Sequence, residues 1–129
     1  MYQKVAPMFL VKNVDEVADW YRNILGAKLH ASLPKNPPFE WVSLLLDDVE
    51  IMFSQQKAAQ RWYSANATIS ETPASFIAYI YVKEVNNLYE QVKGRVKIIV
   101  EPKDQWYGIR EFAIRDPVGS ILVFAQIIE

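Results

Sequence analysis

The chain has 129 residues, of which 51% are hydrophobic and 22% charged, a composition typical of a folded globular protein. Its formal net charge of −1 offers no basic surface for nucleic acid or an anionic membrane, and its lack of cysteine excludes disulfides, thiolate catalysis and zinc–thiolate sites. The sequence contains no apolar run long enough to span a membrane and begins with no signal peptide, so we expect a cytoplasmic location.

The first part of the chain, residues 1–54, predicts one βαβββ module. A short apolar run over residues 5–11 has the length of a strand. Asn13 and Glu16 then form a capping box, and Gly26 is placed to end the helix that it starts. Three further strands are expected, over residues 27–33, 39–46 and 49–54.

Residues 55–75 are expected to link this module to a second one. They show little periodicity, although a short helix over residues 56–63 is compatible with their sequence. An irregular connection of this length is uncommon within a compact domain and is usually a linker or a functional loop.

Residues 76–129 predict the same order of elements. A strand over residues 76–82 precedes a helix that begins at Glu84 and ends before Gly94. Three strands follow, over residues 96–100, 109–115 and 120–128. The last two are joined by Asp116-Pro117-Val118-Gly119, which has the residue preferences of a type I turn and therefore predicts a hairpin.

The two halves also match as sequences. Three pairs of segments share one offset of 71 residues without a gap: 6–14 with 77–85, 40–43 with 111–114, and 48–53 with 119–124. A shared offset predicts a single module written twice. Neither half can bury both faces of its sheet, so we expect the halves, and two chains in a homodimer, to cover one another.

This pattern resembles the vicinal oxygen chelate superfamily, which includes glyoxalase I, extradiol dioxygenases and bleomycin resistance proteins. The likeness is strongest for the bleomycin resistance group, and it lies in Val5-Ala6-Pro7, residues 13–26, Asp47-Asp48-Val49 and the hairpin from Trp106 to Phe124. It implies an α+β fold in which two βαβββ modules form a half-barrel cup. It also implies a homodimer, with exchange of the first strand near Pro7.

The resemblance further implies where a metal would bind. The superfamily's metal enzymes take one ligand from the first and last strand of each module, and these positions fall on Ala6, Met52, Ile77 and Val123. None of these side chains offers the nitrogen or oxygen donors that hard divalent ions need. We therefore expect neither a metal nor another cofactor.

Two other residues were considered as ligands. His30, the only histidine, lies on a different strand and is expected to be an ordinary surface residue. A register with Glu50 in place of Met52 conflicts with the offset, because Glu50 then matches Ile121, and it would supply a single ligand.

Alternation along the strands places further side chains on the face that carries Met52 and Val123. Glu50, Tyr79 and Tyr81 are among them, and Trp41 and Trp106 match the aromatic positions that stack on drugs in the resistance proteins, although Tyr107 is inserted after the second. The predicted ligand-binding residues are Trp41, Glu50, Met52, Tyr79, Tyr81, Trp106, Tyr107 and Val123.

These predictions have ordinary alternatives. Trp41 and Trp106 would equally suit a rim or a dimer contact. Glu50 in an apolar cup should have a raised pKa unless it finds a partner or turns toward water. The charged residues of the last hairpin, Arg110, Glu111, Arg115 and Asp116, are expected to form cross-strand and turn salt bridges.

The sequence thus favours a metal-free protein that binds and sequesters an aromatic or amphipathic small molecule, such as a bleomycin-type antibiotic in a resistance role. An alternative is a lyase, isomerase or dioxygenase of the same superfamily with Glu50 as its base. A third is an interaction module whose cup is filled by its own side chains.

Overall fold

The computed structural model describes residues 1–63 and 77–128. The chain divides into two compact units, Met1–Pro73 and Ala74–Glu129, which are described one at a time. None of the described helices is long and apolar enough to cross a membrane.

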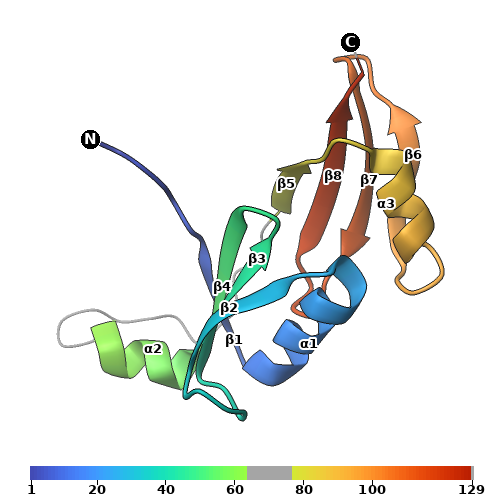
Figure 1. The fold of residues 1–129 in the computed structure, drawn as a ribbon. Helices are drawn as coiled ribbons and strands as arrows, with labels where there is room; N and C mark the ends of the chain where they lie inside the picture. Colours follow the sequence, from blue (N-terminus) through green and yellow to red (C-terminus); the bar gives the residue numbers. More distant parts are fainter. Residues whose placement is uncertain (64–76, 129) are drawn as a thin grey trace. The chain divides into compact units, whose positions relative to one another are not determined.

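Unit 1 contains a four-stranded sheet with the order β1-β4-β3-β2, in which β1 runs parallel to β4. Helix α1 packs against β3 and β4, and helix α2 packs against β1 and β4 (Figure 1). The elements are β1 (Met8–Val11), α1 (Val14–Leu25), β2 (Lys28–Leu33), β3 (Trp41–Leu46), β4 (Val49–Gln55) and α2 (Gln56–Tyr63).

Helix α1 forms as its sequence predicts. The Oδ1 atom of Asn13 accepts a hydrogen bond of 3.0 Å from the backbone N–H of Glu16, which satisfies a free donor of the first turn. Gly26 ends the helix with a φ of 73°, a left-handed conformation that favours glycine. The apolar side of the helix faces the sheet, where the rings of Tyr21 and Phe53 lie 4.9 Å apart and are both fully buried.

Unit 2 repeats this architecture with the strand order β5-β8-β7-β6 and with β5 parallel to β8. Helix α3 packs against β7 and β8 (Figure 1), and its Tyr89 ring lies 5.4 Å from that of the buried Phe112. The elements are β5 (Ile77–Tyr81), α3 (Val85–Val92), β6 (Ile98–Asp104), β7 (Ile109–Arg115) and β8 (Ile121–Ile127). The predicted α+β fold of two βαβββ modules is confirmed.

Strand β6 is longer than the sequence predicts. It continues to Asp104 and therefore includes Pro102, which cannot donate a ladder hydrogen bond. The strand tolerates a proline because it lies at the edge of the sheet and its pairing with β7 shifts register twice. An irregular edge strand of this kind is difficult to delimit from sequence.

The parallel strand pairs follow the predicted repeat. Met8 lies opposite Met52 in unit 1, and Tyr79 lies opposite Val123 in unit 2, so both members of the pair are displaced by 71 residues. The first and last strands of the two modules therefore correspond as the sequence indicates.

The ungapped repeat is wrong for the third strand. On the strands that precede β4 and β8, the corresponding pairs are Ser43 opposite Met52 and Ala113 opposite Val123. Ser43 and Ala113 are 70 residues apart, because the connection from Ala113 to Val123 is one residue longer than the connection from Ser43 to Met52. Trp41 therefore corresponds to Glu111, and not to Phe112 as predicted.

The longer loop is the predicted turn at Asp116. Its carbonyl oxygen accepts a hydrogen bond of 3.0 Å from the N–H of Gly119, which has a φ of 96°. The Oδ1 atom of Asp116 also accepts hydrogen bonds from the N–H groups of Val118 and Ser120, at 3.0 and 2.8 Å. An aspartate side chain that bonds the backbone two residues on is typical of such turns.

Candidate functional site

The candidate residues of unit 1 lie on the face of the sheet opposite the core. Ile51 and Phe53 of β4 are buried in the core, so Glu50 and Met52, which alternate with them, point to the other face. Trp41 shares this second face, because it is the register partner of Ser54. The predicted alternation is therefore correct within unit 1.

Glu50 is held by two partners that the sequence did not indicate. Its side chain is only 9% exposed, and its Oε1 atom lies 2.5 Å from the Nζ atom of Lys4, in the segment before β1. The Ser43 hydroxyl donates a hydrogen bond of 2.5 Å to the other carboxylate oxygen. The Lys4 ammonium first, and then the Ser43 hydroxyl, lower the pKa of Glu50 against the opposing effect of burial. A raised pKa was expected only for a Glu50 without a partner, and Lys4 and Ser43 supply two partners.

Trp41 stands at the other end of the same face. It pairs with Leu33 on β2 and with Ser54 on β4, and its side chain is half-buried. Within the described part of the chain, its buried indole Nε1–H has no hydrogen-bond partner. A buried donor without a partner is uncommon in folded proteins.

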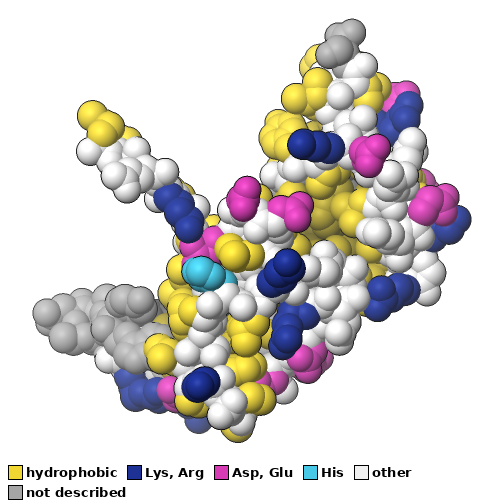
Figure 2. Space-filling view, in the orientation of Figure 1, with side chains coloured by type: hydrophobic (Ala, Val, Ile, Leu, Met, Phe, Trp, Pro, Cys, Tyr) yellow, Lys and Arg dark blue, Asp and Glu magenta, His cyan; other side chains and the backbone are white. Residues whose placement is uncertain are grey.

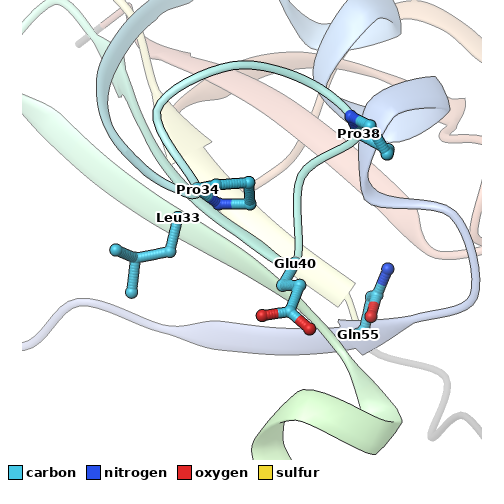
Figure 3. Close-up of a pocket in the computed structure, with 5 residues that line it drawn as sticks. All are labelled: Leu33, Pro34, Pro38, Glu40 and Gln55. Carbon is cyan, nitrogen blue, oxygen red and sulfur yellow. The ribbon is translucent and has the colours of Figure 1, made fainter.

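A shallow cavity of about 650 Å³ lies next to this end of the sheet. Figure 3 shows its lining side chains, which come from the end of β2, the loop after it and the strands beside it: Leu33, Pro34, Pro38, Glu40 and Gln55. Glu40 is already paired with Arg61 of α2 at 2.6 Å. None of the predicted ligand-binding residues lines this cavity, although Trp41 is the register partner of Leu33.

The candidate residues of unit 2 gather around Glu111. The Tyr79 hydroxyl donates a hydrogen bond of 2.9 Å to the Oε1 atom of Glu111, and the Tyr107 hydroxyl donates to the same oxygen. Burial first, and then the bond to Glu111, raise the pKa of Tyr79, whereas the bond to Glu111 is the main cause of the raised pKa of Tyr107. Both phenols therefore remain neutral at physiological pH.

Two more aromatic rings extend this group. The Tyr81 ring lies 5.4 Å from that of Tyr79, and the Trp106 ring lies 5.2 Å from that of Tyr107, both in edge-to-face contact. We call Tyr79, Tyr81, Trp106 and Tyr107 the aromatic cluster. Its members are 41%, 64%, 92% and 46% exposed, respectively, and Figure 2 shows hydrophobic side chains at the surface over β5 and β8.

The charged residues of the last hairpin do not form the predicted set of salt bridges. Arg110 does pair across the strands with Asp104, at 2.5 Å. Arg115 instead donates a hydrogen bond of 2.7 Å to the carbonyl oxygen of Gly119, and Glu111 accepts the two phenols.

The predicted ligand-binding residues thus form two sets. Unit 1 holds Trp41, Glu50 and Met52, and unit 2 holds the aromatic cluster with Val123, the register partner of Tyr79. Sequence reasoning did not assign a site role to Lys4, Ser43 or Glu111. Alternation along β7, once the hairpin is correctly aligned, would have placed Glu111 beside the tyrosines.

The four superfamily metal positions do not fit a metal ion. Ala6, Met52, Ile77 and Val123 supply no carboxylate or imidazole, and a thioether suits only soft metals. Within the described residues, no group of three or more His, Cys, Asp or Glu side chains is placed to hold a metal. We therefore derive no chemical step that passes through a metal.

Two sheets of order β1-β4-β3-β2 and β5-β8-β7-β6, each with a helix on its core face, define a protein built from paired βαβββ modules. Residues 5–124 match the family model described as "Glyoxalase/Bleomycin resistance protein/Dioxygenase superfamily". The chain belongs to this superfamily. No curated protein sequence matches it.

Solved structures agree with this fold. TioX from Micromonospora sp. ML1 is 14% identical, with a TM-score of 0.83 over 98% of this chain and 99% of that chain. A glyoxalase/bleomycin resistance protein/dioxygenase from Nocardioides is 12% identical, with a TM-score of 0.78 over 100% and 86%. A lactoylglutathione lyase from Agrobacterium tumefaciens is 16% identical, with a TM-score of 0.74 over 96% and 92%. At these identities the likeness shows the fold alone.

Proposed function

We propose that this protein binds a small aromatic or amphipathic molecule without a metal and sequesters it, as a member of the bleomycin resistance type. The observation that carries the proposal is the set of apolar side chains at the four superfamily metal positions: Ala6, Met52, Ile77 and Val123. A face without metal donors can still bind a ligand through apolar area and a few polar groups.

The aromatic cluster supports this proposal. Its rings are exposed at the surface, where a flat ligand can reach them, and Trp106 is 92% exposed. Large exposed aromatic side chains bury much apolar area when a ligand covers them, and they lose little conformational freedom in doing so. A bleomycin-type antibiotic, which carries flat rings, is one candidate.

The alternative is a lyase, isomerase or dioxygenase that uses Glu50 as a general base. The ion pair with Lys4 weakens this alternative, because it lowers the pKa of Glu50. A general base works best with a pKa near the operating pH, so a carboxylate shifted further from neutrality is a poorer base.

Titration of the purified protein with bleomycin-type antibiotics, followed by tryptophan fluorescence, tests the proposal. We expect saturable quenching that a chelator does not change and that Trp106→Phe reduces. Trp20→Phe is the matched control, because Trp20 lies on α1 against Tyr21. A stoichiometric metal ion on which a measured activity depends would overturn the proposal.

A further inference from the structure

We propose that unit 2 recognises an aromatic ligand that carries a positive charge, such as a protonated or quaternary amine, with Glu111 and the adjacent tyrosine rings as the point of recognition. This inference rests on the proposed function and names the chemical class of its ligand. It concerns a residue, Glu111, to which the predicted site gave no part.

The charge balance of two carboxylates leads to this inference. Glu50 and Glu111 both lie on the faces that carry the predicted ligand-binding residues. The chain supplies a cation to Glu50, whose Oε1 atom lies 2.5 Å from the Lys4 ammonium. Glu111 receives only the two neutral phenols, and within the described residues it takes part in no ion pair. A half-buried carboxylate without an ion-pair partner among the described residues attracts a cation.

The two phenols prepare the site for such a charge. Because Tyr79 and Tyr107 donate to one carboxylate oxygen, their hydroxyls converge and their rings are held in place. A cation that pairs with Glu111 would lie beside both tyrosines, and electron-rich aromatic rings attract ammonium groups. Tyr81 and Trp106, in edge-to-face contact with them, offer area for the flat part of the ligand.

A small side chain lies between two groups of the proposed site. Ala125 of β8 lies between Tyr81 on β5 and Glu111 on β7 in the pairing register, and it is fully buried. Its methyl group is the shortest side chain of any residue other than glycine. Tyr81 and Glu111 therefore flank a small residue, and no bulky side chain of β8 separates them at this register position.

One positively charged side chain of the protein lies on the strand next to the same carboxylate. Lys103 on β6 is the register partner of Glu111, so both side chains emerge on the same face. It is exposed and belongs to none of the ion pairs of the described residues. Its positive charge should repel a cationic ligand, so such a ligand should bind more tightly when Lys103 is neutralised.

A matched pair of probes tests the inference on the full chain. The (4-hydroxyphenyl)trimethylammonium ion and 4-tert-butylphenol have the same shape and differ in charge. We expect isothermal titration calorimetry to give a dissociation constant about tenfold lower for the cation, which is the scale of a desolvated cation–π and charge interaction. Glu111→Gln should reduce this preference to about twofold or less, because the amide keeps the shape and loses the charge.

Three variants complete the test. Glu101→Gln, a control carboxylate that accepts the Tyr89 hydroxyl and lies outside both sets of ligand-binding residues, should keep the preference for the cation, and Lys103→Gln should increase it. If Glu111→Gln folds poorly by circular dichroism, the double variant Tyr79→Phe with Tyr107→Phe replaces it, and we expect it to weaken the binding of the cation more than that of the neutral probe.

The outcomes separate this inference from the proposed function. Equal dissociation constants of the two probes for the wild-type protein would overturn the cation inference and leave aromatic binding intact. A preference lost in Glu50→Gln and kept in Glu111→Gln would overturn it as well, because the charge would then be read in unit 1. Failure of both probes and of bleomycin-type antibiotics to bind would overturn the proposed function itself.

Discussion

Tyr79 on β5 and Glu111 on β7 are joined by a hydrogen bond of 2.9 Å, although strand β8 lies between their strands. The bond is diagonal, since the register partner of Tyr79 on β8 is Val123 and that of Glu111 is Ala125. The long phenol side chain can cross this distance because the alanine beside its path is short. One small residue thus allows two separated strands to share a polar group.

The charge of Glu111 should control the titration of two tyrosines. Glu111→Gln removes a negative charge beside Tyr79 and Tyr107, so their raised pKa values should fall toward the ordinary value of 10.0. Ultraviolet absorbance of tyrosinate, measured against pH, should show two of the seven tyrosines ionising earlier than in the wild-type protein. Glu50→Gln serves as the control, and an unchanged titration curve in Glu111→Gln would contradict the prediction.

The ion pair of Glu50 should contribute stability that acid removes. The pKa of Glu50 is lowered in the folded protein, so its contribution is fully present above the ordinary value of 4.5 and is lost as the pH falls through the folded value. The free energy of unfolding of the wild-type protein should therefore fall more steeply below about pH 4.5 than that of Glu50→Gln. Urea titrations of both proteins at several pH values measure this difference, and parallel curves would contradict it.

A larger side chain at position 125 should separate the aromatic cluster from Glu111. Ala125→Leu places a branched group on a fully buried position between β5 and β7. Overpacking of this kind typically costs about 1–3 kcal/mol. We expect a loss of unfolding free energy in this range in urea, together with a lowered pKa of Tyr79, whereas Ala125→Ser should leave the tyrosine titration almost unchanged.

The core and the exposed ring should respond differently to truncation. Phe53 and Phe112 are fully buried beneath α1 and α3, so their replacement by alanine should each cost about 3–5 kcal/mol of unfolding free energy. Trp106 is 92% exposed, and Trp106→Ala should change stability by no more than about 0.5 kcal/mol. Thermal and urea unfolding measure both, and a strongly destabilised Trp106→Ala would assign this ring to the core.

A two-fold dimer, with exchange of the first strand, remains our prediction for the assembly. Residues 1–7 extend from β1 as a segment without regular structure (Figure 1), and Tyr2 and Val5 on it are 98% and 90% exposed. Apolar side chains this exposed would gain from contact with a second chain. Light scattering should give the mass of a dimer, and deletion of residues 1–5 should shift it toward the monomer; a monomeric full chain would contradict the prediction.

The order of elements could be predicted from sequence because its signals are local. The capping residue Asn13, the helix-ending Gly26 and the turn at Asp116 each fix a backbone conformation within a few residues. The β7–β8 hairpin was likewise placed by a short-range pattern, whereas the helix over residues 56–63 was only compatible with a segment of little periodicity. Strand β4 ran one residue beyond its predicted end, and strand β6 ran four, because edge position and bulges depend on the whole sheet.

The site could be predicted only in part because its partners are not local. Alternation placed Glu50 on the correct face, but nothing in the sequence indicated that Lys4, 46 residues earlier, would reach its carboxylate. The link between Tyr79 and Glu111 depends on a correct alignment of strands that are 32 residues apart in the sequence. A carboxylate's partners decide both its pKa and its role, and these partners appear only when the strands are paired.

The connection between the register pairs of β7 and β8 is one residue longer than that of β3 and β4. An alignment of the two modules has to allow for this residue on the third strand. Because side chains on a strand alternate, a displacement of one residue exchanges its two faces completely. A chimera that copied β7 into the place of β3 at the constant offset would turn Phe112 outward at position 41 and send Arg115 into the core at the buried position 44. The two modules can therefore exchange whole hairpins with their loops, whereas exchange of the isolated strand would destroy both the hydrophobic interior and the polar surface.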